Sequence, residues 1–159
     1  MPTLTPNILF NHEALEAAEF YVSVFADAEI RHVNRFGDAG PLEVGTVLTV
    51  DFVLDGQEFT AINSGVTFVP NESISFRVSC HGQEEVDHYW YALSEGGSEG
   101  QCGWLKDRFG VSWQITPAGM GAILGGPDPA GRGRAMRAMM SMGRLEIAAL
   151  EAAYRGEAE

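Results

Sequence analysis

Apolar and polar residues alternate over several short stretches of the chain, most cleanly near residue 111. Apolar side chains at 111, 113 and 115 alternate with polar ones at 112, 114 and 116, which is the two-residue period of a strand with two unlike faces. The residues before them, 99–110, predict the first arm and the turn of a hairpin. One face of this hairpin is therefore expected to pack on a core, and the other to line a polar cavity.

The chain runs through one order of elements twice. The first half predicts a strand at 7–10, a helix at about 13–25 capped by Asn11, and strands at 29–36, 44–54 and 57–63. The second half predicts a strand at 73–79, a helix at 83–93 and the hairpin at 99–115, at an offset of 68 residues from the first. This pattern predicts an α+β fold, in which two tandem βαβββ modules form a curved mixed sheet around a cleft.

Composition changes after Pro117, where a glycine-bearing connector leads to a cap and helix start at Asp128-Pro129. Two short helices are expected at 135–142 and 145–154, with methionines at 136, 139, 140 and 142. We therefore predict a domain at 1–118, with modules of about 1–66 and 72–118, and a C-terminal helical extension at 119–159. The methionine surface is expected to pack on the domain or on a dimer partner, and a lid over a ligand is the alternative.

Charge and composition exclude several classes of function. The chain has 159 residues and a net charge of −12, which opposes binding to nucleic acid or to an anionic membrane surface. It has neither an apolar run of the roughly 20 residues that a membrane span needs nor a signal peptide at its start. A cytoplasmic protein is expected. Cys80 and Cys102 lack a CxxC spacing, so reduced thiols are expected, and a catalytic thiol at Cys102 is the alternative.

Several motifs together resemble one known superfamily over nearly the whole chain. The segments that carry this resemblance are 16–21, 45–50, 71–76, 83–87, 100–107 and 109–115, with 128–129 and 147–153 in the tail. Through them the sequence is similar to the PhnB-like branch of the vicinal oxygen chelate superfamily, which also holds glyoxalase I, bleomycin-resistance proteins and extradiol dioxygenases. Many members of this branch carry the label 3-demethylubiquinone-9 3-methyltransferase. The resemblance implies the glyoxalase/bleomycin resistance-like fold and a homodimer.

Metal-dependent members of the superfamily take His and Glu ligands from four strands, and the resemblance assigns those places to uncharged residues here. They fall at Thr5 or Asn7, at Ala61 or Asn63, at Ser75 and at Gln114. Neutral amides and hydroxyls bring no charge to offset the lost hydration of a divalent cation, so we expect no metal site. We expect no cofactor either, because no glycine-rich turn stands between a strand and a helix to hold S-adenosylmethionine.

The residues that replace the ligands are candidates for binding a small molecule. Amide and hydroxyl groups are expected to face the cleft, beside a guanidinium that suits a carboxylate or phosphonate and an indole that offers a flat wall. Each candidate also has a structural interpretation: a turn at Asn63, a bridge between strands at Gln114, and an ion pair or solvation at Arg77. The candidates are Asn7, Asn63, Ser75, Arg77, Trp104 and Gln114.

The sequence therefore favours metal-free binding of a small organic ligand between the modules, with no catalytic residue identified. The alternative is an enzyme, a lyase, isomerase or transferase, that uses Gln114, Asn63 and Arg77 around its substrate. The methyltransferase named by the family label and a pure interaction module are further alternatives.

Overall fold

Two four-stranded mixed sheets carry the fold, one in each of two units, Met1–Val69 and Pro70–Glu159. The computed structural model describes residues 2–157. Each unit contains one βαβββ module, so the predicted α+β class and the repeated order of elements are confirmed. The cleft predicted between the two modules stays a prediction. In the described part of the chain, no helix combines the length and the hydrophobicity that crossing a membrane requires.

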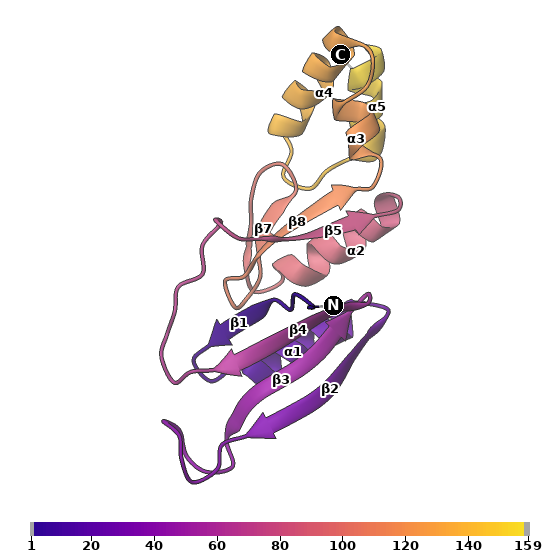
Figure 1. The fold of residues 1–159 in the computed structure, drawn as a ribbon. Helices are drawn as coiled ribbons and strands as arrows, with labels where there is room; N and C mark the ends of the chain where they lie inside the picture. The colour runs from indigo at the N-terminus through magenta and orange to yellow at the C-terminus, as the bar shows by residue number, and fades with distance from the viewer. Residues whose placement is uncertain (1, 158–159) are drawn as a thin grey trace. The chain divides into compact units, whose positions relative to one another are not determined.

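The first unit pairs its strands in the order β1-β4-β3-β2, and only the β1–β4 pair is parallel. Helix α1 covers one face of this sheet (Figure 1), where the Tyr21 ring stacks on Phe52 and Phe52 stacks on Phe59. Asp55 and Gly56 both have positive φ and close the β3–β4 turn as the sequence predicts. The elements are β1 (Asn7–Phe10), α1 (Ala14–Val24), β2 (Ala28–Arg35), β3 (Val47–Leu54) and β4 (Gln57–Asn63).

The second unit repeats this topology with the strand order β5-β8-β7-β6, again with one parallel pair, β5–β8. Its core contains Trp113 and Ile115 of β8 and Trp90 of α2, all 2% exposed or less. The sequence predicted this face of the hairpin correctly. The elements are β5 (Phe76–Cys80), α2 (Gln83–Ser94), β6 (Ser98–Glu99), β7 (Trp104–Lys106) and β8 (Ser112–Pro117).

Three helices follow β8 and form a small core of their own within the second unit (Figure 1). They are α3 (Met120–Leu124), α4 (Pro129–Met140) and α5 (Ile147–Arg155). Asp128 caps α4, because its carboxylate accepts a hydrogen bond from the Ala130 N–H at 3.0 Å. The core of this helical extension is built from Ile123, Ala135, Leu145 and Leu150.

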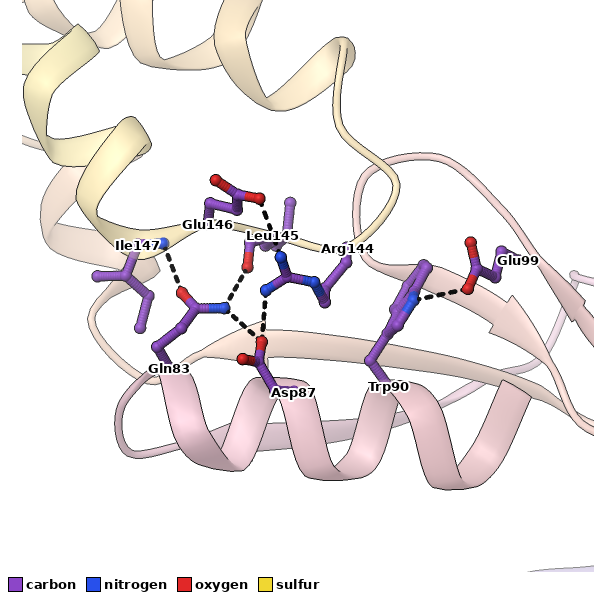
Figure 2. A network of polar contacts seen from close by, with 8 residues as sticks. All are labelled: Gln83, Asp87, Trp90, Glu99, Arg144, Leu145, Glu146 and Ile147. Carbon is purple, nitrogen blue, oxygen red and sulfur yellow. Dashed lines mark hydrogen bonds and ion pairs between the residues drawn. The ribbon is translucent and has the colours of Figure 1, made fainter. Parts of the chain in front are cut away.

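Polar side chains of α2 fix the helical extension to the rest of the second unit (Figure 2). The Gln83 amide accepts from the Ile147 N–H at 2.9 Å and donates to the Leu145 carbonyl at 3.0 Å. Gln83 therefore satisfies a backbone N–H at the N-terminal end of α5, where the Glu146 side chain forms no cap. Beside it, the Arg144 guanidinium pairs with Asp87.

One predicted cap is wrong. The helix α1 has no side-chain cap from Asn11 or from Glu13 at its N-cap position. The Ala14 N–H instead donates to the Asn63 side chain at 2.9 Å, which comes from the end of β4. A distant residue takes this role because β1 and β4 run parallel and end together, with Phe10 opposite Asn63.

Candidate functional site

Each sheet has one face covered by its helix and one open face, and the open face of the second sheet is rich in hydroxyls. Strand register places nine residues on this face, and none of these nine is a carboxylate. Two of them, Arg77 and Lys106, are cationic in a chain of net charge −12. The nine are Ser75, Arg77 and Ser79, then Ser98, Trp104 and Lys106, then Ser112, Gln114 and Thr116.

A row of three unlike side chains crosses this open face. Gln114 on β8 stands opposite Arg77 on β5 and opposite Trp104 on β7. Adjacent strands lie about 4.8 Å apart, so a guanidinium, an amide and an indole follow one another at a spacing that one small molecule can span. The Gln114 Nε2 donates to the Ser75 hydroxyl at 2.8 Å, which fixes the amide and leaves its oxygen as an acceptor.

A second row, of Lys106 and Ser112, lies next to the first. Ser112 is 2% exposed, and its hydroxyl has no hydrogen-bond partner among the described residues. The Lys106 ammonium pairs with Glu72 at 2.6 Å, and this hydrogen bond holds the pKa of Glu72 below its usual value. Trp104 and Lys106 border a shallow hollow of about 200 Å³.

The open face of the first sheet has the opposite charge. Its carboxylates are Glu29, Asp51 and Glu58, and the Arg31 guanidinium is 3.1 Å from Glu29 and 4.0 Å from Glu58. A hollow of about 380 Å³ lies over this face. The polar residues that line it are Thr5, Asn7, Arg31, His32, Asp51, Glu58 and Thr60.

Sequence reasoning missed His32 and Asp51, which the structure brings together in this hollow. A β-bulge between Ile30 and His32 shifts the register of β2, so His32 stands opposite Asp51 on the open face. The Thr60 hydroxyl donates to Asp51 Oδ1 at 2.7 Å and orients the carboxylate. The sequence prediction of 29–36 depended on the two-residue alternation of a strand. The bulge breaks this alternation, so the sequence did not reveal that His32 faces outward.

Five of the six predicted binding residues lie on the open faces. Arg77, Trp104, Gln114 and Ser75 share the second sheet, and Asn7 lines the hollow over the first. Asn7 is exposed, and its amide donates to the Thr5 carbonyl at 2.8 Å.

The predicted orientation of Asn63 is wrong. Asn63 is 5% exposed and Ala61 is fully buried, so both lie on the helix side of β4. The Asn63 amide is used structurally, since it accepts from Ala14 and donates to the Val47 carbonyl at 3.0 Å. The sequence prediction assigned the outward positions of β4 with a register error of one residue. Thr60, opposite Asn7, holds the outward position.

The donor set does not fit the metal centre of metal-dependent relatives. The outward positions on β1, β4 and β8 hold Asn7, Thr60 and Gln114, and Ser75 stands just before β5; all four are uncharged. Within residues 2–157, no three His, Cys, Asp or Glu side chains gather closely enough to hold a metal ion.

Comparison with known proteins agrees with the fold. Two βαβββ modules define a glyoxalase/bleomycin resistance-like protein of the vicinal oxygen chelate superfamily. Residues 2–116 match the family model described as 3-demethylubiquinone-9 3-methyltransferase, and the chain belongs to this PhnB-like family. The match ends before the three C-terminal helices. No curated protein matches the sequence.

Solved structures resemble the chain over the same region. The PhnB protein from Bacillus cereus is 36% identical, and the match covers 74% of this chain and 100% of that one with a TM-score of 0.68. A protein from Pseudomonas aeruginosa is 20% identical over 74% of this chain and 98% of that one, with a TM-score of 0.62. The fosfomycin resistance protein FosX from Listeria monocytogenes, solved with Mn(II) and sulfate, is 12% identical over 78% and 95%, with a TM-score of 0.50. The last two show likeness of fold alone.

Proposed function

We propose that the protein binds a small organic anion with a planar part on the open face of its second sheet, without a metal ion. The observation that supports this most is the row of Arg77, Gln114 and Trp104 on a face whose strand positions hold no carboxylate. A guanidinium forms strong paired hydrogen bonds with carboxylate or phosphate. An indole offers a flat apolar surface for a ring.

Lys106, opposite Ser112, adds a second positive charge at this end of the face. Arg77 is therefore the main attraction for an anion, and Lys106 contributes less because it pairs with Glu72 at 2.6 Å.

Calorimetric titration with benzoate, phenyl phosphate and benzylamine tests the proposal. These probes share a ring and differ in charge, so the two anions should bind and the amine should not. Arg77→Gln should weaken anion binding about tenfold, the usual scale for one hydrogen bond to a charged group. Gln114→Ala should weaken it less and change stability little.

Arg31→Gln on the first sheet is the matched control, since Arg31 is also an exposed arginine of an open face. It should leave anion binding unchanged. Absence of heat with both anions, or equal losses in Arg77→Gln and Arg31→Gln, would refute an anion site at Arg77.

A second candidate function is acid–base catalysis in the hollow of the first sheet. His32 opposite Asp51 supplies a titratable pair with the carboxylate oriented by Thr60. This supports a lyase or isomerase rather than a binding protein. Conversion of a bound anion by the wild type that His32→Gln abolishes, with binding retained, would favour it.

We do not extend the family label to its reaction. The strand-to-helix turns at 11–13, 81–82 and 118–119 contain one glycine at most, Gly82 in the second and Gly119 in the third. None of them forms the glycine-rich turn that holds S-adenosylmethionine in Rossmann-type methyltransferases. Calorimetry with S-adenosylmethionine should give no binding heat.

A further inference from the structure

Sulfur-bearing side chains gather at the C-terminal end of α4: Cys102 lies within the region that the family model matches, and the methionines of α4 lie outside it. The Cys102 Sγ lies 3.6 Å from the Met140 Sδ and 3.6 Å from the Met139 carbonyl oxygen. Met136 precedes Met140 by four residues, so both methionines lie on one face of the helix. They are 43% and 60% exposed, whereas Met139 packs on the helical core.

The backbone holds the Cys102 thiol against this helix end. Cys102 has a φ of 59°, a left-handed conformation that residues other than glycine rarely adopt. Hydrogen bonds from the Cys102 N–H to the Met142 carbonyl at 2.7 Å and from the Gly103 N–H to the Gly143 carbonyl at 2.8 Å fix the turn. The thiol is therefore placed by two segments, the turn before β7 and the residues that follow α4.

The chemistry of this cluster suits a soft cation. Thiolate and thioether sulfurs are ligands that select Cu(I) over the hard divalent ions. The last carbonyls of α4 carry partial negative charge, which favours a cation at this end of the helix. The Cys102 thiol, the Met140 thioether and the Met139 carbonyl oxygen lie together, and Met136 lies one turn away on the same helix face. The proposed anion site uses none of these residues.

We propose that Cys102, Met136 and Met140 bind one Cu(I) ion at the end of α4. The Cys102 thiol releases its proton to solvent as the Cu–S bond forms, and no change of oxidation state is involved. Cys80 takes no part, because it is 1% exposed and burial raises the pKa of its thiol to about 12. The second cysteine of the chain is therefore an internal control.

Anaerobic titration of the full chain with Cu(I), in competition with bicinchoninate, tests the site. The wild type and Cys80→Ala should each bind one equivalent. Substitution of residues that only contact a metal's ligands weakens metal binding about 10–100-fold. Cys102→Ser removes a direct ligand, so it should weaken Cu(I) binding at least as much. The Met136→Leu/Met140→Leu double variant should also lose affinity, and circular dichroism checks its fold.

Iodoacetamide labelling gives an independent readout. Cu(I) should protect Cys102 from alkylation in the wild type, and should not protect it in the double methionine variant, whose cysteines are unchanged. The proposal is overturned if the wild type fails to compete with bicinchoninate. Undiminished Cu(I) affinity in Cys102→Ser or in the double methionine variant overturns it equally, and loss of binding in Cys80→Ala alone would place the ion elsewhere.

Discussion

The open faces of the two sheets have the same strand topology and opposite chemistry. The first face presents Glu29, Asp51 and Glu58 beside Arg31 and His32. The second presents Arg77 and Lys106 among hydroxyls and one amide. Topology determines which positions point outward, since both sheets follow the βαβββ order, but it does not determine which groups stand there. The function of each face therefore depends on the side chains that it presents.

Each unit also has a buried polar side chain that holds neighbouring segments together by hydrogen bonds, Asp107 in the second unit and Asn63 in the first, and the two differ in the number of those bonds. The Asp107 carboxylate, 2% exposed, accepts from the N–H groups of Phe109 and Val111 at 2.8 and 3.0 Å and from the Trp113 indole at 2.8 Å. Asn63 makes two such bonds in the first unit. The second unit thus depends more on a single residue.

Asp107→Ala is expected to have the largest effect on stability. It removes the acceptor of two buried donors and one half-buried donor, so the free energy of unfolding should fall by about 3–5 kcal/mol. Asn63→Ala should cost about 2–3 kcal/mol, because it affects one donor and one acceptor. Urea unfolding measures both, with the exposed Asn7→Ala as the control. An Asn63→Ala loss as large as that of Asp107→Ala would remove the contrast between the units.

Gln83→Ala tests a second difference, the helical extension that only the second unit has. Loss of its bonds to Leu145 and Ile147 should lower the free energy of unfolding by about 1–3 kcal/mol. Gln57→Ala is the matched control, since the exposed Gln57 amide reaches only the Glu58 carbonyl of the adjacent residue. Equal effects of the two changes in urea unfolding would show that the Gln83 contacts do not secure the extension.

The sequence predicted the fold well because its main signals are local. The alternation at 111–116 correctly separated the buried Trp113 and Ile115 from the outward Gln114. The Asp55-Gly56 turn and the Asp128 cap depend on neighbouring residues, and both were predicted.

The sequence predictions fail where a side chain contacts a residue far away in the sequence, or where a bulge interrupts the two-residue alternation of a strand. Asn63 caps a helix that begins 49 residues earlier, which no local pattern reveals. The β2 bulge hid His32 from the alternation. Gln83 and Leu145, 62 residues apart, meet only because the extension packs on α2. The family resemblance and the alternation together selected the five candidate binding residues that lie on the open faces, but neither states what these residues bind.

The smallest expected effect bears most directly on the charge contrast between the two open faces. Glu72→Gln removes the carboxylate that pairs with Lys106, and leaves the ammonium more available to a ligand. Solvent screens this exposed ion pair, so binding of phenyl phosphate should strengthen only slightly, by about twofold. Glu58→Gln, which relieves the long 4.0 Å pair with Arg31 on the first sheet, is the control and should leave binding unchanged. If both changes strengthen binding equally, the gain comes from the lower net charge of the whole chain, and Lys106 is not a local contact for the anion.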